Sequence, residues 1–528
     1  MDTPIEIAAA VRRKERKAVD VLDECLAATD VSNRALNAFV FLDVDGARRS
    51  AAAVDEAVAR GDDPGRFAGV PFGVKDLSDA AGMPTSKGSL LFKGRPPVER
   101  DSIDVARLRA AGAVPIGKTA APEFGSVCYT STRAWGTTRN PWDTSKTSGG
   151  SSGGSSAAVA AGMVPMATAS DGGGSTRIPA AFCGLVGLKP SYGRIPHPDA
   201  GASQTTADGA LVTTVTDAAR HLDVCAGPDD RDRVSLPADT EVRRAGGYER
   251  LIESLDVSGL RVGWSLDLGF AIVDPEVAAL TEGAARDLAA ALGAELVAMD
   301  VRLTDPVRAW LGANVLDLHQ DLEPGMWPER ADELEPLNRA ILASVERVTP
   351  ARMARIWQRR MRLEQEVGAI HAEVDVLVTP ATAVPAFAAA GPMPEMIDGR
   401  GVIPPMIVPF TMMANLCWNP AVSVPAGLTA GGLPVGLQIQ GPRHRDDLVL
   451  RVARVYEQAR PWPRLAPWAG AAASGPGPST SGSSTSVSST SGSSTSASST
   501  SASSTSGSST SGSSTSALSP SVLSPGDL

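Results

Sequence analysis

Ser148-Gly-Gly-Ser-Ser-Gly-Gly-Ser-Ser156 and Asp171-Gly-Gly-Gly-Ser-Thr-Arg-Ile-Pro179 are the stretches that dominate any interpretation of this chain. They lie on either side of an alanine-rich segment, Ala157-Ala-Val-Ala-Ala-Gly162. Glycine has no Cβ, so clusters of glycine allow backbone N–H groups to approach a ligand closely. Such groups suit an anion, either a phosphate or an oxyanion that develops during a reaction.

Three kinds of site compete for these stretches. A phosphate-binding loop needs a lysine after its last glycine, and neither stretch has one. A nucleophile elbow, G-x-S-x-G, fits around both Ser151 and Ser152, but a short pattern that fits twice in a Gly/Ser run is weak. It also needs a histidine base, and none of the five histidines lies in a suggestive motif. A lysine base explains more of the sequence.

Outside these stretches, the hydrophobic pattern alternates between strands and helices. Helices are predicted over residues 5–30, 46–60 and 102–112, and strands over 37–42, 69–76 and 113–117. A strand followed by a helix is predicted over 210–226 and a helix over 275–295. A long helical segment is predicted over 330–373, strands over 374–380, 422–425 and 434–440, and a final helix over 446–459. This alternation predicts an α/β layered fold.

Charge and composition exclude several classes of protein. The net charge is −10, and the densest basic cluster, Arg12 to Lys17, is interpreted as a solvated helix face. We therefore expect no nucleic-acid partner. No apolar run reaches the roughly 20 residues that span a bilayer, so no membrane partner is expected. The five cysteines are scattered without a C-x-x-C pair, which predicts reduced thiols, no structural metal and a cytoplasmic protein.

The composition changes near Ala473. From Ser479 onward the chain repeats a Ser/Thr-rich unit that cannot bury enough apolar surface to offset its ordering entropy. Residues 474–528 are therefore predicted to be a disordered tail. Since no comparable linker interrupts the rest, residues 1–470 are predicted to form one large domain.

Several motifs together resemble the amidase signature family. Gly73-Val-Lys-Asp76 precedes the first glycine-serine stretch, and Trp135-Gly-Thr-Thr-Arg-Asn-Pro-Trp142 lies between them. Cys183-Gly-Leu-Val-Gly-Leu-Lys-Pro-Ser-Tyr-Gly-Arg194 follows the second stretch. More distant matches are Asp375 to Pro380, Asn419 to Gly427 and Gly432 to Gly441, so the resemblance spans roughly residues 5–465. It implies a single domain with a central mixed β-sheet flanked by helices.

The resemblance also implies a Ser–cis-Ser–Lys catalytic triad, carried over to Ser175, Ser151 and Lys75. Ser175 would be the nucleophile, which is weak until a base takes its proton. Lys75 can act only as a free amine, so its pKa must fall well below about 10.4. The apolar neighbours Val70, Phe72, Val74 and Leu77 would supply the desolvation. The alternative is an ordinary surface lysine or an ion pair with Asp76.

The remaining site predictions concern the loops around the triad. Ser151 would pass protons between Lys75 and Ser175, with Ser152 as a supporting hydrogen-bond partner. The backbone N–H groups of Gly172, Gly173, Gly174 and Ser175 would form the oxyanion hole. An ion pair between Asp171 and Arg177 would brace this turn. No metal or organic cofactor is expected.

The resemblance predicts hydrolysis of monocarboxylic acid amides, and the residues favour apolar or aryl amides as substrates. The candidate pocket residues are Trp310, Trp327, Trp357, Met406, Met412, Met413 and Trp418, although for each of them taken singly core packing is the favoured explanation. The partner would be a small-molecule amide, with a homodimer as a candidate assembly. Two alternatives stay open. One is a glutamine-hydrolysing subunit for tRNA-dependent transamidation, which Ile178 and Thr205 to Leu211 disfavour; the other is a catalytically silent binding protein.

Overall fold

A mixed β-sheet runs through the computed structural model, which describes residues 1–198 and 201–468. The predicted tail at 474–528 lies outside the described residues. Within the described ranges the main sheet has 11 strands. In spatial order they are β1 (Phe39–Leu42), β3 (Val114–Thr119), β2 (Pro71–Lys75), β6 (Met166–Asp171), β8 (Ala207–Val212), β7 (Val186–Lys189), β14 (Ala421–Leu428), β15 (Pro434–Gln440), β11 (Val376–Pro380), β9 (Val262–Trp264) and β10 (Leu296–Ala298).

Both strand orientations occur in this sheet. β2 pairs in parallel with β3 and β6, and β9 pairs in parallel with β10 and β11. The strands between β6 and β11 pair antiparallel. Two short hairpins are separate from it: β4 (Ser131–Thr132) with β5 (Gly136–Thr137), and β12 (Met396–Ile397) with β13 (Arg400–Gly401). The central strands are buried, as expected for a sheet covered by helices.

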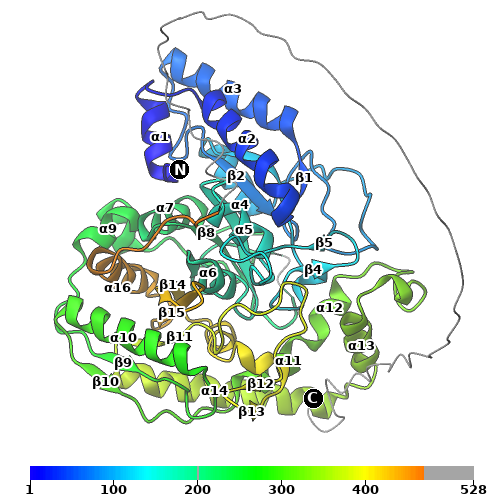
Figure 1. The fold of residues 1–528 in the computed structure, drawn as a ribbon, viewed down its shortest axis with the longest axis vertical. Helices are drawn as coiled ribbons and strands as arrows, with labels where there is room; N and C mark the ends of the chain where they lie inside the picture. The colour runs from blue at the N-terminus through cyan, green and yellow to red at the C-terminus, as the bar shows by residue number, and fades with distance from the viewer. Residues whose placement is uncertain (199–200, 469–528) are drawn as a thin grey trace, which may run out of the picture.

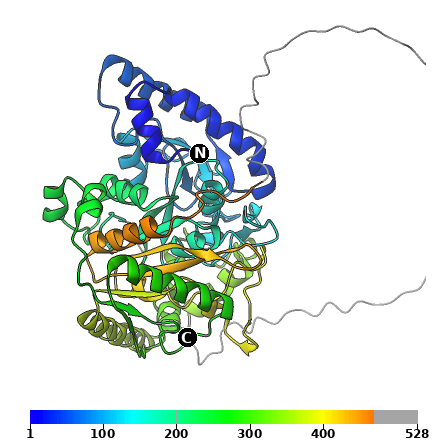
Figure 2. The ribbon, with the colours of Figure 1, turned by 60° about the vertical axis from the view of Figure 1, so that its left-hand side comes forward.

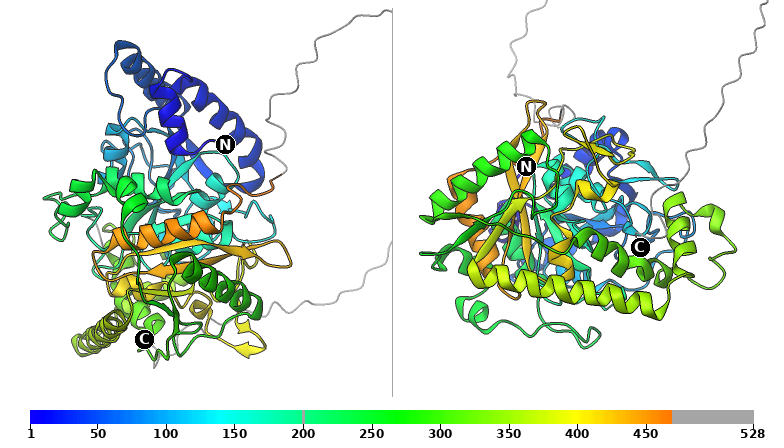
Figure 3. Two further views of the ribbon diagram at one scale, coloured as in Figure 1. Left: turned by 90° about the vertical axis from the view of Figure 1, so that its left-hand side faces the viewer. Right: turned by 90° about the horizontal axis from the view of Figure 1, so that it is seen from below.

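Helices cover the sheet along its length (Figures 1 and 2). They are α1 (Pro4–Arg12), α2 (Ala18–Leu36), α3 (Val44–Arg60), α4 (Ile103–Ala110), α5 (Gly153–Ala160), α6 (Arg177–Cys183), α7 (Val215–Cys225), α8 (Thr240–Ala245), α9 (Tyr248–Ser254), α10 (Pro275–Leu292), α11 (Pro306–Ala313), α12 (Asp317–Gln320), α13 (Pro336–Val345), α14 (Pro350–Glu373), α15 (Met412–Leu416) and α16 (Asp446–Ala459). The first three gather at one end of the molecule, and α14 runs along the other (Figures 1 and 3). The predicted α/β architecture is confirmed.

α5 differs from the surface helices because every one of its residues is buried. Its sequence, GGSSAAVA, contains only small side chains apart from one valine. Small side chains let neighbouring backbones approach, and the helix packs against β2, β6 and α6. This packing holds the first glycine-serine stretch, which leads into α5, against the end of β6.

Two segments that were predicted to be continuous helices are interrupted in the structure. The segment 5–30 is interrupted between α1 and α2, where Lys14 adopts a positive φ of 61°. The basic cluster from Arg13 to Lys17 therefore lies in a turn and not on a helix face. The segment 330–373 is interrupted before α14, whose N-cap is Thr349 and whose first residue is Pro350. Proline lacks an N–H and favours the first turn of a helix, so a new helix starts there.

Candidate active site

The site lies where two neighbouring parallel strands end. Lys75 is the last residue of β2, and Asp171 is the last residue of β6. The carboxyl ends of adjacent parallel strands lie at the same edge of a sheet, where α/β proteins commonly form their sites. The loop before α5 carries Ser151, and the turn between β6 and α6 carries Ser175. The Ser152 N–H donates to the Ser175 carbonyl at 3.3 Å, which joins this loop and this turn.

The amine of Lys75 is fully buried and surrounded by oxygen atoms. Its Nζ lies 2.8 Å from Ser151 Oγ, 2.9 Å from Ser170 Oγ and 3.1 Å from the Ser170 carbonyl. The predicted alternative, an ion pair with Asp76, is wrong: Asp76 lies 3.9 Å from Lys118 and accepts hydrogen bonds from Ser86. The geometry thus gives Lys75 hydroxyl and carbonyl partners.

Burial sets the protonation of this lysine. Desolvation lowers the pKa of Lys75 to about 7, while the negative charges of Asp171 and Asp208 act in the opposite direction. Burial disfavours the ammonium because the charge loses its hydration. With this pKa, Lys75 is the free amine in a substantial fraction of the molecules near neutral pH, and the free amine is the form that a base requires.

Ser170 is a site residue that the sequence analysis missed. It faces Lys75 together with Thr168, whose hydroxyl accepts the Lys75 backbone N–H at 2.9 Å. Residues two apart on a strand face the same side, so the alternation of Thr168 and Ser170 within Met166-Ala-Thr-Ala-Ser-Asp171 was the available signal. The signal was weak because Thr168 is the one β-branched residue in β6, and the strand has no aromatic residue.

Ser151 follows a cis peptide bond, Gly150–Ser151, as the family resemblance implies. Gly150 fits only because it has no side chain: a Cβ there would lie 2.6 Å from the Tyr129 nitrogen and 2.7 Å from the Val127 carbonyl oxygen. On the other side, a Cβ at Gly125 would lie 3.1 Å from Ser151 Oγ. The segment 125–129 therefore packs closely against both residues of this cis peptide, with Gly125 beside the Ser151 hydroxyl.

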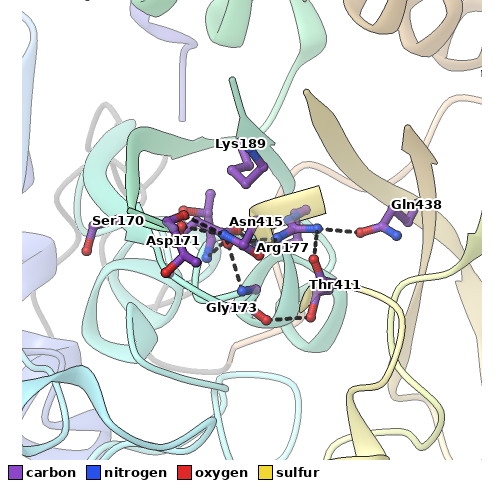
Figure 4. A network of polar contacts seen from close by, with 12 residues as sticks. Ser170, Asp171, Gly173, Arg177, Lys189, Thr411, Asn415 and Gln438 are labelled. Atoms are coloured by element: carbon purple, nitrogen blue, oxygen red, sulfur yellow. Dashed lines mark hydrogen bonds and ion pairs between the residues drawn. The ribbon is translucent and has the colours of Figure 1, made fainter. Parts of the chain in front are cut away.

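Asp171 and Arg177 form the predicted ion pair beneath the Asp171–Ser175 turn (Figure 4). Arg177 Nη2 lies 2.7 Å from Asp171 Oδ1, and both side chains are fully buried. Burial alone would raise the pKa of Asp171, but the Arg177 guanidinium lowers it to about 2. Arg177 also donates to Asn415 and the Thr411 carbonyl at α15 and to Gln438 on β15, so the turn is tied to two later segments of the chain.

The same carboxylate organises the turn's backbone. Asp171 accepts the N–H of Gly174 at 2.7 Å and the N–H of Thr176 at 3.2 Å. Among the described residues, the N–H groups of Gly172, Gly173 and Ser175 have no acceptor. Gly174 is thus already engaged, and three of the four donors predicted for the oxyanion hole are free for a ligand.

Two side chains from the second half of the chain hold the turn from outside. Trp310 Nε1 donates to the Gly172 carbonyl at 2.6 Å, and Thr411 Oγ1 donates to the Gly173 carbonyl at 2.6 Å. A Cβ at Gly173 would lie 2.7 Å from the Trp310 ring. Of the seven predicted pocket residues, Trp310 is therefore the one that the structure brings against the Asp171–Ser175 turn.

The other candidates have different surroundings. Trp418 stacks on Tyr192, and Trp357 is exposed on α14. Met412 and Met413 are buried in a core cluster, Met406 packs against that cluster, and Trp327 packs in a separate one. Ser152 contributes its backbone; its hydroxyl lies 3.5 Å from the Ser170 carbonyl, at the limit of a hydrogen bond.

Comparison with known proteins shows which family this chain belongs to. The family model for amidases matches residues 20–450. An acylamidase from Rhodococcus erythropolis is 37% identical over 467 residues, covering 87% of this chain and 95% of the relative. The chain belongs to the amidase signature family.

Relatives of this amidase signature hydrolase include proteins with different named activities. A glutamyl-tRNA(Gln) amidotransferase subunit from Synechococcus sp. (strain CC9605) is 36% identical over 469 residues, covering 83% of this chain and 92% of the relative. The crystal structure of a bacterial aryl acylamidase of the family superimposes with a TM-score of 0.80 at 27% identity, covering 87% of this chain and 96% of the other. Enzymes of this family hydrolyse the C–N bond of amides.

Three further features bear on the predicted class of protein. All five cysteines are buried and unpaired. Among residues 1–198 and 201–468, no three His, Cys, Asp or Glu side chains are grouped so that they could hold a metal ion. Over the same ranges, no helix has both the length and the apolar character needed to cross a membrane.

Proposed function

We propose that this amidase signature hydrolase cleaves apolar or aryl amides through an acyl-enzyme on Ser175, with Ser151 and Lys75 as its proton relay. The observation that carries the proposal is the fully buried Lys75 amine, 2.8 Å from Ser151 Oγ. A free amine in this position can draw a proton from Ser151 as Ser151 takes one from Ser175. A nucleophile elbow would need a histidine there, whereas the base that reaches Ser151 is a lysine.

The reaction would proceed in two halves. Ser175 Oγ attacks the amide carbonyl carbon, its proton passes to Ser151, and the Ser151 proton passes to Lys75. The Lys75 ammonium then returns a proton through Ser151 to the leaving nitrogen, the C–N bond breaks, and an acyl ester remains on Ser175. Because amines are poor leaving groups, this protonation matters as much as the attack. Water next attacks the ester by the same relay and releases the carboxylic acid.

The oxyanion would bind to the backbone N–H groups of Gly172, Gly173 and Ser175. These donors are free, and the Asp171–Arg177 pair holds them in place before the substrate arrives. Preorganised donors stabilise developing charge without reorganisation, and losing one commonly costs about 10²–10³ in rate. Gly174 contributes by its hydrogen bond to Asp171, which shapes the turn.

The substrate class is supported by the relatives and by Trp310. One relative is named an acylamidase and a structural neighbour an aryl acylamidase. The second candidate, glutamine hydrolysis for transamidation, is favoured by the relatives named glutamyl-tRNA(Gln) amidotransferase subunits. Ile178 weighs against it, because this residue belongs to an apolar core cluster and lies against Gly174. Hydrolysis of an aryl amide such as p-nitroacetanilide, compared with acetamide, oleamide and glutamine, tests the choice. Preferential glutamine hydrolysis would contradict the proposal.

We expect kcat/KM for an uncharged amide to rise with pH through about 7 and then reach a plateau. The reactive form holds Lys75 as a free amine, so below its pKa each pH unit should lower the rate about tenfold. Rates between about pH 5 and about pH 9 measure this limb. A profile that is flat over this range, with no limb near pH 7, would exclude Lys75 as the base in the form proposed here.

W310F should lower kcat/KM for aryl amides roughly fivefold, which corresponds to one lost hydrogen bond of about 1 kcal/mol. Phenylalanine keeps an aromatic ring beside Gly173 but cannot donate to the Gly172 carbonyl. W310A should in addition reduce the preference for aryl over aliphatic amides. Steady-state rates on both amide types provide the measurement, and W357F, on exposed α14, is the matched control. Identical selectivity in W310A and wild type would remove Trp310 from the pocket.

A further inference from the structure

A buried carboxylate that the proposed mechanism does not use lies next to the Lys75 site. Asp208 on β8 is directly opposite Ser170 on β6 in the antiparallel register, and its side chain is buried. Residues directly opposite in an antiparallel pair project to the same face, with Cβ atoms about 4.5–5.5 Å apart. Ser170 Oγ in turn lies 2.9 Å from Lys75 Nζ. Asp208 is therefore separated from the amine of Lys75 by one side chain.

The two oxygens of Asp208 have different surroundings. Oδ2 lies 2.9 Å from Nδ1 of His197, whose side chain is 29% exposed. Oδ1 is buried and has no hydrogen-bond partner among the described residues. A buried carboxylate with an unsatisfied oxygen is costly, so its presence here calls for a role. The imidazole of His197 links this carboxylate to the protein surface.

Other titratable groups also face Asp208. Asp104 on α4 is fully buried, and burial together with the negative charge of Asp208 raises the pKa of Asp104 to about 6. From α7, His221 lies 3.5 Å from Cys225. Burial lowers the pKa of His221 to about 4 against the influence of Asp208, and burial with the charges of Asp104 and Asp208 raises that of Cys225. The charge of Asp208 thus acts on the pKa of each of four groups: Lys75, Asp104, His221 and Cys225.

We propose that Asp208 and His197 form a positioning pair that sets the pH range in which Lys75 serves as the base. The inference rests on the proposed function, because it assigns to Lys75 the role given above. The Asp208 carboxylate favours the ammonium form of Lys75, and a protonated His197 partly cancels this effect. The pair adjusts the base from behind Ser170 without touching the substrate.

The sign of the effect follows from charge. Burial lowers the pKa of Lys75, and Asp171 and Asp208 oppose that shift. Asp171 is held by Arg177, so its charge is fixed by its own partner. Removing the charge of Asp208 takes away support for the ammonium, and the free amine then persists to lower pH. Removing a charge that lies one side chain away in a protein interior is expected to move the acidic limb of the pH profile by about one pH unit.

The test is the pH profile of kcat/KM for p-nitroacetanilide with full-length D208N. We expect its acidic limb to move down by about one pH unit while the plateau falls, because a less basic amine is a weaker base. A residue with only a structural role would lower the whole profile without moving the limb. D217N is the matched control: Asp217 on α7 is equally buried, but it is held by the Ile5 N–H and by Thr214, the N-cap of α7. Its limb should coincide with that of wild type.

H197Q provides a second, independent variant at a partly exposed position. Glutamine can keep a hydrogen bond to Asp208 but cannot carry a positive charge, so the limb should move to higher pH. Limbs of D208N and H197Q that both coincide with wild type would overturn the inference. The proposed function would be overturned by a different result: a wild-type profile without an acidic limb, or a K75M profile that keeps the same limb. The two failures are therefore distinguishable.

Discussion

S175A is expected to abolish amide hydrolysis, with kcat lower by a factor of at least about 10⁴. The substitution removes the oxygen that forms the acyl-enzyme and leaves the oxyanion donors and the Asp171–Arg177 pair in place. Residual activity of such variants comes from binding and oxyanion stabilisation alone. The measurement is single-turnover hydrolysis of p-nitroacetanilide, with circular dichroism to verify the fold.

S152A is the matched control for this variant. Ser152 neighbours Ser151 and joins the Ser175 turn through its backbone N–H, which alanine retains. Within residues 1–198 and 201–468, its hydroxyl makes only the long contact with the Ser170 carbonyl, so we expect a loss of less than about tenfold. If S152A were as inactive as S175A, or if S175A kept more than a few per cent of the activity, the assignment of the nucleophile would be wrong.

K75M is expected to lower kcat by a factor of about 10³ or more at pH 8, without loss of stability. Methionine has a similar length and no base, so the proton of Ser175 has no destination. Replacing the buried amine by an apolar side chain removes its desolvation cost, which offsets the loss of its hydrogen bonds to Ser151 and Ser170. The measurements are the turnover rate and the midpoint of thermal unfolding.

K118M supplies the opposite pattern as a control. Lys118 lies on β3 beside β2, is equally buried, and is the partner of buried Asp76. Its replacement leaves Asp76 without its cation, so the midpoint of unfolding should fall while turnover persists. Loss of activity in K118M comparable to that in K75M would indicate that both lysines act through the fold.

The sequence predicted the residues that meet at the site better than it predicted the strands around them. Lys75, Ser151, Asp171 and Arg177 could be singled out because catalytic motifs require particular residues at fixed places. β6 and β7 escaped the analysis because every residue of both strands is buried, and neither short segment shows the near-continuous apolar run that is typical of strands covered on both faces. Ser170 was lost with β6.

Features that depend on tertiary contact could not be predicted. The engagement of Gly174 by Asp171 follows from the path of the turn, which no spacing rule specifies. Trp310 could not be separated from the other aromatic candidates because its contact with Gly172 joins residues far apart in the chain. The pairing of Asp208 with His197 and its position opposite Ser170 depend on the register of β6 with β8.

The central claim is a covalent acyl-enzyme on Ser175, formed with Lys75 as the base. Its most direct test is intact-mass and peptide mass spectrometry of the protein quenched with acid during turnover of p-nitrophenyl butyrate, a substrate with a better leaving group than an amide. The account predicts a butyryl adduct on the peptide containing Ser175, absent in S175A and strongly reduced in K75M. Turnover accompanied by an adduct on another residue, or an adduct that forms at the wild-type rate in K75M, would contradict it.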